Sequence, residues 1–288
     1  MTSPNAPLAA LPGISVILPV LNEEAHLEES IRAILAQNYT GDYEIIVALG
    51  PSQDLTSEIA ARLSEENSRI ILVSNPTGRT AAGLNLALHR SHREIIVRVD
   101  AHAEIPPHYL QLVVEILADS GAVNVGGVMG AEGVTLFESA VAAAMRSPFG
   151  VGGSRFHIGG KAGFVDTVYL GAFLRQAVVD VGGFDERFIR AQDWELNYRL
   201  RENGGKIYFD PRLHVTYRPR PNFRRLAKQY FEYGRWRRVI ARKYPETINY
   251  RYLAPPLALI GTVLSLFAGA LINPSLYLPA ATYFTFIY

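Results

Sequence analysis

The chain contains no cysteine among its 288 residues, which excludes disulfide bonds and metal sites built on thiolates. A long segment also lacks charge, because no Asp, Glu, Lys or Arg occurs from Tyr252 to Tyr288. Residues 1–12 carry neither a cationic start nor a long apolar core. We therefore expect no signal peptide in this segment.

The net charge of +1 conceals a strongly basic segment. Residues 218–251 contain eleven Lys and Arg against only Glu232 and Glu246, so they carry +9 and the remainder carries −8. Such a segment suits a phosphate-rich surface, either nucleic acid or anionic lipid. The apolar stretch 253–272 that follows is long enough for a transmembrane helix. The sequence therefore favours membrane lipids as partners and predicts no binding of nucleic acid.

The chain is expected to have four parts: an N-terminal tail (1–12), an α/β catalytic domain (13–217), a basic amphipathic interface segment (218–251) and a transmembrane region (252–288). Within the third part, Phe223–Lys243 reads as a helix lying on the membrane, which Gly234 is expected to break or kink. The alternative is a helix that merely caps the domain. A second apolar span, 276–288, stops early, so we expect the sequence to be a fragment of a longer protein. The basic segment predicts a cytoplasmic catalytic domain at a bacterial-type plasma membrane.

Strand and helix patterns alternate through the first half of the chain, which predicts a mostly parallel sheet with right-handed crossovers. Farther on, Gln192–Glu202 reads as a helix that ends at Asn203 and two glycines. Residues 206–209 and 213–217 are expected to form two short strands. The strands expected in the first half are Ile14–Val20, Tyr43–Leu49, 70–73, 94–99 and 123–128.

The most informative stretch is 95–102, in which a β-branched run ends at Asp100 and His102 follows two residues later. Ligands bind at the carboxyl ends of strands in open α/β sheets. An Asp-x-His pair in that position could hold a divalent cation against a diphosphate. The alternative is a turn aspartate beside a solvent-exposed histidine.

Four segments occur in an order that resembles a family 2 glycosyltransferase with the GT-A fold. They are residues 16–24 (VILPVLNEE), 100–102 (DAH), 182–186 (GGFDE) and 192–196 (QDWEL). The segments 98–103 (RVDAHA) and 233–236 (YGRW) resemble in particular the membrane-anchored, succinoglycan-type (ExoA-like) branch. The resemblance spans roughly residues 14–240, and it implies a Rossmann-like, mostly parallel sheet.

The resemblance implies a donor site for a nucleotide-diphospho-sugar. Pro19, Asn22 and Glu23 would hold the nucleotide, with Glu23 accepting hydrogen bonds from the ribose, and Arg79 and Asp100 would lie near the diphosphate. Glu23 could instead be a first-turn helix acid, and Arg79 a solvated loop residue. Residues 49–52 (LGPS) stand where the family usually has an acid that reads the base, so the sequence does not predict the base.

Asp100 and His102 match the metal-binding Asp-x-Asp of the family, which implies Mg²⁺ or Mn²⁺ as cofactor. A hard cation prefers oxygen ligands, and an imidazole shifts the preference toward Mn²⁺. Asp100 is therefore the expected ligand. His102 could bind the metal directly, bind it through water or not bind it at all.

The acceptor side would carry the general base, which the resemblance assigns to Asp193. Its alternative role is a helix N-terminal acid favoured by the macrodipole. Asp166, Trp194 and Trp236 are the candidate acceptor-binding residues. Asp166 could instead make structural hydrogen bonds, and Trp236 could be an anchor at the membrane interface.

The sequence thus predicts an inverting, membrane-anchored glycosyltransferase that acts on a lipid-linked acceptor in polysaccharide or glycolipid biosynthesis. The base Asp193 favours a sugar hydroxyl over a polyprenyl phosphate as acceptor, because a phosphate is already ionised. Three alternatives stay open: a polyprenyl-phosphate sugar synthase, a non-catalytic nucleotide-sugar-binding scaffold, and a metal-dependent phosphohydrolase that uses Asp100.

Overall fold

A mixed sheet of eight strands lies at the centre of the computed structural model, which describes residues 11–147, 154–248 and 254–287. The strand order is β3-β2-β1-β4-β7-β5-β8-β6. The first four are parallel, β7 is antiparallel to β4 and β5, β5 is parallel to β8, and β6 is antiparallel to β8. The strands are β1 Ile14–Val20, β2 Tyr43–Leu49, β3 Ile70–Ser74, β4 Ile95–Arg98, β5 Asn124–Ala131, β6 Gly163–Val165, β7 Tyr169–Leu174 and β8 Ile207–Tyr217.

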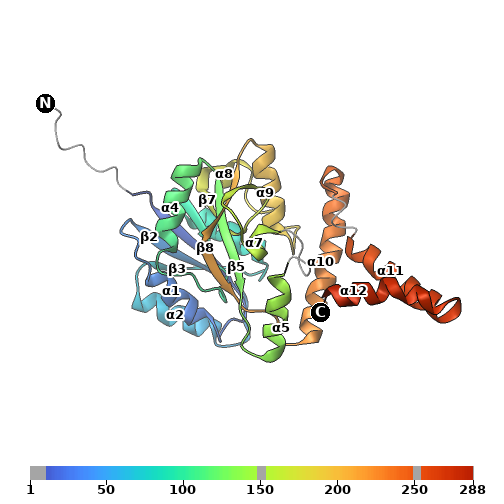
Figure 1. Cartoon of the computed structure of the whole chain (residues 1–288). Helices are drawn as coiled ribbons and strands as arrows, with labels where there is room; N and C mark the ends of the chain where they lie inside the picture. The colour runs from blue at the N-terminus through green and yellow to red at the C-terminus, as the bar shows by residue number, and fades with distance from the viewer. Residues whose placement is uncertain (1–10, 148–153, 249–253, 288) are drawn as a thin grey trace.

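Helices cover both faces of this sheet (Figure 1). Side chains of α1, α2 and α4 pack on one face, while those of α3, α8 and α9 pack on the other. Both faces are therefore buried, which explains why β1 and β2 are nearly continuous apolar runs. The helices of the body are α1 Leu27–Leu35, α2 Thr56–Glu66, α3 Thr80–Arg90, α4 Tyr109–Ser120, α5 Leu136–Met145, α7 Arg155–Ile158, α8 Arg175–Asp180 and α9 Gln192–Glu202.

The prediction of two short strands near residue 210 was wrong, because one strand, β8, runs through both. Its pairing with β5 shifts register between Gly126 and Val128, so residues 210–213 bulge out of the ladder. Within the bulge, Arg212 donates to Asp210. The bulge therefore accommodates Pro211 within a single strand.

The C-terminal part begins with α10 (Phe223–Lys243), which lies beside the body (Figure 1). Gly234 was expected to break or kink this helix, but the helix runs through it without a break, and a Cβ at Gly234 would meet no atom within 4 Å. After η1 (Pro245–Thr247), α11 (Ala254–Leu271), η3 (Pro274–Tyr277) and α12 (Leu278–Ile287) form a hairpin that projects from the body. The Ser265 hydroxyl ties the hairpin together by donating to the Leu276 carbonyl at 2.6 Å.

None of the helices in the described ranges is both long and apolar enough to cross a membrane, so the predicted transmembrane spans within 252–288 are not supported. The predicted N-terminal tail, residues 1–12, lies almost entirely outside the described residues.

Two glycines give opposite predictions for the same substitution. A Cβ at Gly127 would lie 1.6 Å from the Leu213 carbonyl oxygen, a backbone atom that cannot move independently. We expect Gly127→Ala to lower the free energy of unfolding by roughly 3 kcal/mol, at the upper end of overpacking costs. Gly234→Ala, in open space on a helix, should raise it by up to about 1 kcal/mol. Thermal unfolding of both variants checks the pair, and a stable Gly127→Ala protein would contradict the close approach of β5 and β8.

Candidate active site

The loop after β1 and the turn after β4 meet at one edge of the sheet. The two strands are parallel neighbours with Ile17 opposite Arg98, so their carboxyl ends lie side by side. Glu23 Oε1 of the first loop lies 3.0 Å from His102 Nδ1 of the second. The predicted nucleotide loop and the predicted metal-binding turn therefore share one site.

Asn22 adopts a left-handed backbone conformation, with φ 54°, which asparagine tolerates better than most residues. Its backbone N–H donates to Ser52 Oγ at 3.0 Å, and its side-chain Oδ1 accepts the Gln53 N–H at 2.8 Å. The Glu23 N–H donates to Thr56 Oγ1 at 2.8 Å. These bonds clamp the β1 loop to the β2 loop, so the Asn22 amide has a structural task that the sequence analysis did not foresee.

Pro19 and Arg79 lie at the same edge. Pro19 packs toward α3, since a Cβ at Gly83 would be 3.4 Å from its Cβ. Arg79 immediately precedes α3, and its side chain is exposed, with no carboxylate partner among the described residues. The structure thus leaves the Arg79 guanidinium available to an anion, but no contact joins it to Asp100.

A buried guanidinium joins the two halves of the site. Arg98, at the end of β4, is only 5% exposed. Its Nε and Nη2 donate to Asp100 Oδ1 at 3.1 and 2.9 Å, and its Nη1 donates to Asp193 Oδ1. The predicted metal ligand and the predicted base, 93 positions apart in the chain, therefore bind the same cation.

From the sequence, Arg98 was recognised only as part of the segment 98–103, and no role was predicted for it. The signal was nevertheless present, because Arg98 interrupts a run of isoleucine and valine in a strand expected to be buried. A buried arginine must be paired. At least one acid close in space was therefore required.

The charges of this cluster shift each other's titration. Burial works against the charged form of Arg98, but Asp100 and Asp193 outweigh it and raise the pKa of Arg98. Burial also raises the pKa of Asp193 above its ordinary value, the Arg98 charge opposes this rise, and the Asp100 charge adds to it. Asp193 is therefore a stronger base than a free aspartate, and Arg98 holds it in a fixed orientation.

His102 is held in a different way. Burial lowers the pKa of its imidazole, but the hydrogen bond to Glu23 and the charge of Asp100 outweigh burial and raise the pKa. A metal ligand must be the neutral imidazole. The contact with Glu23 uses Nδ1, so Nε2 is the ring nitrogen left for a metal, and it could bind one only while the imidazole is neutral.

The donor set fits a cation that is completed by the substrate. Both contacts from Arg98 go to Oδ1 of Asp100, and no donor from the described residues reaches Oδ2. Within those residues there is also no cluster of three or more His, Asp or Glu side chains that could hold a metal. Mg²⁺ sites with phosphate substrates commonly use one or two carboxylates plus phosphate oxygens and water. Asp100 meets that requirement.

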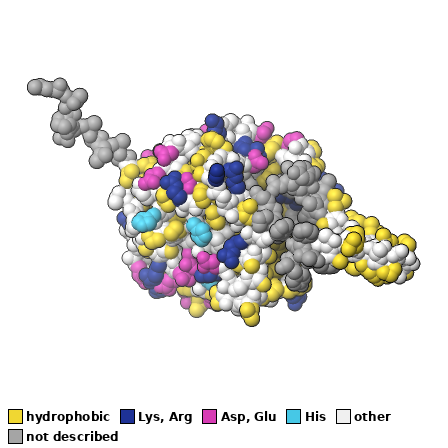
Figure 2. All heavy atoms as spheres, viewed as in Figure 1, with side chains coloured by type: hydrophobic (Ala, Val, Ile, Leu, Met, Phe, Trp, Pro, Cys, Tyr) yellow, Lys and Arg dark blue, Asp and Glu magenta, His cyan; other side chains and the backbone are white. Residues whose placement is uncertain are grey.

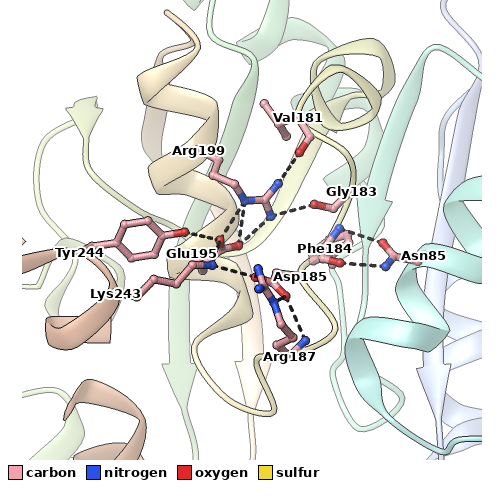
Figure 3. Close-up of polar contacts among 10 residues, drawn as sticks. All are labelled: Asn85, Val181, Gly183, Phe184, Asp185, Arg187, Glu195, Arg199, Lys243 and Tyr244. Atoms are coloured by element: carbon pink, nitrogen blue, oxygen red, sulfur yellow. Dashed lines mark hydrogen bonds and ion pairs between the residues drawn. The ribbon is translucent and has the colours of Figure 1, made fainter. Parts of the chain in front are cut away.

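The first turn of α9 carries Asp193 toward Arg98, and Glu195 takes a different direction. Glu195 is fully buried and accepts from Arg199 Nη2 at 2.7 Å and from the Tyr244 hydroxyl at 2.7 Å (Figure 3). These bonds occupy Glu195 away from the Arg98 cluster. Glu195 is thus positioned to hold α9 in place rather than to act as a base.

The glycine-rich loop before α9 is fastened from two sides (Figure 3). Arg199 donates to the carbonyls of Val181 and Gly183 at 2.6 and 2.8 Å. The Asn85 side chain of α3 accepts the Phe184 N–H and donates to the Phe184 carbonyl, both at 2.8 Å. The loop therefore fixes the angle at which α9, and with it Asp193, enters the site.

Two of the three predicted acceptor residues lie together. Asp166 and Trp194 line a cavity of about 300 Å³ on the outer side of α9. Trp236 lies elsewhere, with its ring centroid 5.7 Å from that of Phe188. Trp236 thus packs α10 onto the body, and the structure does not bring it to the cavity.

The family model described as Glycosyl transferase family 2 matches residues 15–182. The chain belongs to glycosyl transferase family 2. The prediction of the family and of a glycosyltransferase is therefore confirmed, as is the α/β GT-A fold with its mostly parallel sheet.

Curated relatives of this glycosyltransferase support the assignment. The succinoglycan biosynthesis protein ExoA of Rhizobium meliloti (strain 1021) is 33% identical over 224 residues, which cover 77% of this chain and 68% of that protein. A dolichyl N-acetyl-α-D-glucosaminyl phosphate 3-β-D-2,3-diacetamido-2,3-dideoxy-β-D-glucuronosyltransferase of Methanococcus voltae is 24% identical, over 80% of this chain and 74% of that protein.

Solved structures agree in fold. The mannosyltransferase PcManGT of Pyrobaculum calidifontis, in complex with GDP-Man and Mn²⁺, matches with a TM-score of 0.62 and 21% identity, over 96% of this chain and 77% of that chain. S. aureus TarS 1-349 in complex with UDP matches with a TM-score of 0.57 and 17% identity, over 73% of this chain and 61% of that chain.

Replacing Arg98 tests the bridge directly. Arg98→Met keeps most of the volume but leaves Asp100 and Asp193 without their shared cation. We expect it to lower the free energy of unfolding by about 3 kcal/mol, the lower end of the cost of breaking a buried ion pair. Arg32→Met breaks an exposed pair with Glu28 and should change it by less than about 1 kcal/mol. Urea unfolding of both variants compares them, and equal effects would contradict a structural role for the bridge.

Proposed function

We propose that this glycosyltransferase inverts the anomeric centre as it transfers a sugar from a nucleotide-diphospho-sugar to a hydroxyl of a lipid-linked glycan. The observation that carries the proposal is the arrangement of Asp100 and Asp193 on either side of Arg98. Arg98 contacts Oδ1 of each carboxylate, so Oδ2 of each is left for another partner. One carboxylate then serves the donor and the other serves the acceptor.

On the donor side, Asp100 Oδ2 would hold Mg²⁺ or Mn²⁺ against the diphosphate. When bound, the cation stabilises the negative charge that develops on the leaving diphosphate. The exposed Arg79 guanidinium would donate to the same phosphates. Glu23, now paired with His102, would exchange that contact for the ribose hydroxyls. The relatives in complex with GDP-Man and Mn²⁺ or with UDP support a nucleotide-sugar donor.

On the acceptor side, Asp193 Oδ2 would take the proton of the attacking hydroxyl. The hydroxyl oxygen forms the new bond to the anomeric carbon as the bond from that carbon to the phosphate oxygen breaks, and the nucleoside diphosphate leaves with the bonding electrons. A single displacement from the opposite face inverts the configuration. Arg98 keeps Asp193 oriented while its charge changes, because Asp100 continues to neutralise the guanidinium.

The relatives support an acceptor in polysaccharide or glycoconjugate synthesis. They include a succinoglycan biosynthesis protein, poly-β-1,6-N-acetyl-D-glucosamine synthases of Staphylococcus aureus, and the Methanococcus voltae enzyme that is named for a dolichyl-linked sugar phosphate. The last favours an acceptor that is both a sugar and lipid-linked. A polyprenyl-phosphate acceptor is the second candidate, and it would not need Asp193 as a base.

The exposed side chains of α10 and of the C-terminal hairpin support the proposal that the enzyme binds a membrane surface. Phe223 and Phe231 of α10 are 74% and 67% exposed among arginines and lysines, a composition typical of interfacial helices. The projecting hairpin also exposes apolar side chains, including Leu264 and Phe267 (Figure 2). We propose that α10 and the hairpin bind the cytoplasmic leaflet of a bacterial plasma membrane, which brings the active site to a lipid-linked acceptor.

Two substitutions in one assay test the division of roles. Asp193→Asn cannot accept a proton, so we expect sugar transfer to fall about 10²–10⁴-fold while donor binding stays near that of the wild type. Asp100→Asn should instead remove most of the dependence of nucleotide-diphosphate binding on Mn²⁺. Donor affinity with and without Mn²⁺ is measured by calorimetry, and transfer is measured with lipid extract as acceptor source.

Near-wild-type transfer by Asp193→Asn would move the base elsewhere. Unchanged Mn²⁺-dependent affinity in Asp100→Asn would remove Asp100 from the metal site. Nucleotide release that proceeds equally without any lipid extract would favour hydrolysis over transfer.

Membrane binding is tested with the full chain and vesicles of phosphatidylglycerol and phosphatidylethanolamine. Each basic residue near an anionic surface contributes about 1 kcal/mol of binding free energy. We therefore expect the protein to sediment with the vesicles at low salt and to bind them more weakly at high salt. Replacing Phe223 and Phe231 together by serine should weaken binding by at least about tenfold. Replacing Leu55 and Ile189, exposed apolar residues of the body, should not. Equal effects of the two pairs would make α10 a capping helix.

A further inference from the structure

A cavity of about 300 Å³ runs along the outer side of α9. This volume lies at the lower end of the range for small-ligand sites, roughly 300–1,000 Å³. Trp194, Tyr198, Arg201 and Glu202 line it from the helix, Asp166 from the turn after β6, and Glu246 from η1. Three segments that are distant in sequence therefore build it.

The cavity begins one residue along the helix from the proposed base. Residues 194, 198, 201 and 202 are spaced by four, seven and eight positions, so they share one face of α9. Trp194 follows Asp193 in the chain, and Glu202 ends the helix. At 1.5 Å per residue, the lining extends about 12 Å along the helix. Asp193 is not part of the lining, because neighbouring residues of a helix point in different directions, so an acceptor held in the cavity would pass around the first turn of α9 to reach it.

Aromatic side chains form one wall. The rings of Trp194 and Tyr198 are stacked, with centroids 5.7 Å apart and an interplanar angle of 14°. The Tyr244 ring lies 4.5 Å from that of Tyr198. The two nearly parallel rings lie against one another, so each keeps only its edge and at most one face for a ligand, and a pyranose presents a flat face of C–H groups with hydroxyls around its edge. An aromatic side chain of this cavity can therefore pack against a sugar ring.

Polar groups surround this wall. The Tyr198 hydroxyl donates to Glu246 Oε1 at 2.6 Å. Arg201 Nη1 lies 3.7 Å from Asp166 Oδ1, while Arg201 Nε is buried without a hydrogen-bond partner. The Asp166 side chain is 85% exposed. Exposed carboxylate oxygens accept hydrogen bonds from hydroxyls, and the unpaired N–H of Arg201 requires an acceptor.

The charge of the lining restricts the ligand. Asp166, Glu202 and Glu246 carry three negative charges against the one positive charge of Arg201. A phosphate or a uronate would be repelled by this excess, whereas a neutral sugar would not. The cavity is therefore unsuited to the phosphate of a lipid carrier and suited to the glycan that the carrier bears.

The segment before Glu246 is anchored to α9, the helix that carries the proposed base. Tyr244 donates to the buried Glu195 of α9 at 2.7 Å, and Lys243 Nζ lies 2.9 Å from Asp185 Oδ2 (Figure 3). The end of α10 is thus fixed to α9 and to the loop that precedes it. The η1 wall of the cavity therefore follows directly after the helix that we propose to lie on the membrane.

We infer that this cavity binds a neutral pyranose unit of the acceptor glycan, set back from the hydroxyl that reacts. The inference rests on the proposed function for the direction of the acceptor, but the binding of a neutral oligosaccharide at this place does not require transfer to occur. It assigns Tyr198, Arg201 and Glu246 to acceptor recognition. It also extends the acceptor site two turns of α9 beyond Asp193.

The fluorescence of Trp194, which lines the cavity, can report ligand binding. It contains two tryptophans, Trp194 and Trp236, so Trp236→Phe leaves Trp194 as the single indole while keeping an aromatic ring against Phe188. In this background, the fluorescence of Trp194 is titrated with the neutral probes cellotetraose, chitotetraose and maltotetraose and with the anionic probe tetragalacturonate. We expect a saturable change with at least one neutral probe and none with the anionic one.

Substitutions locate the binding. Tyr198→Ala should weaken the affinity for the responding probe at least about tenfold, the value of one aromatic contact of about 1.4 kcal/mol. Tyr198→Phe keeps the ring and loses only the bond to Glu246, so it should have a smaller effect and also shows that loss of affinity is not loss of folding. Tyr230→Ala removes an exposed tyrosine of α10 and should leave the affinity unchanged.

The outcomes separate this inference from the proposed function. No saturable response to any neutral probe, tighter binding of tetragalacturonate, or equal effects of Tyr198→Ala and Tyr230→Ala would each overturn the inference. If a neutral probe binds as expected while Asp193→Asn retains full transfer, the inference stands and the assignment of the base fails.

Discussion

One buried cation organises this enzyme. A guanidinium that is 5% exposed has lost most of its hydration, and its burial is tolerable only if carboxylates replace the water. Arg98 obtains one from the turn that follows its own strand and one from the first turn of α9. The first belongs to the donor side of the sheet and the second to the acceptor side. The requirement that Arg98 be neutralised therefore brings the two halves of the site to a common centre before any substrate is present.

A second buried charge fixes the position of α9. Glu195 is fully buried, and its partners are Arg199 of the same helix and Tyr244 just beyond α10 (Figure 3). Arg199 also holds the carbonyls of the preceding loop. The two acids of the first turn therefore have separate partners: Asp193 binds Arg98, while Glu195 ties the helix to its support. Any movement of α10 at a membrane would reach α9 through Tyr244, so the support of the base and the wall of the acceptor cavity form one unit.

The sequence pattern predicted correctly those helices and strands whose bounds depend on neighbouring residues alone. The bounds of β1, β2 and α9 agree with the sequence expectation because apolar periodicity and a glycine C-cap define them without help from distant residues. The meeting of Glu23 with the Asp100 turn followed from parallel strand ends. The bridge from Asp100 to Asp193 did not, since it depends on the three-dimensional path between the two halves. The single strand β8 was missed for the same reason: its pairing with β5 and its bulge outweigh the turn signal of Pro211.

The Arg98 bridge also explains a departure from the family pattern. The family resemblance implies two acids at the start of this helix, whereas this chain has Gln192 before Asp193. Gln192 is buried, at 8% exposure, so an acid there would add a buried negative charge next in the chain to Asp193, which already shares one guanidinium with Asp100. Such a charge would raise the pKa of Asp193 further and drive it toward the protonated form, in which it cannot act as a base. An amide keeps the volume and the polarity of the side chain without that charge. The loss of the second acid is therefore consistent with an active base whose counter-ion is a single arginine.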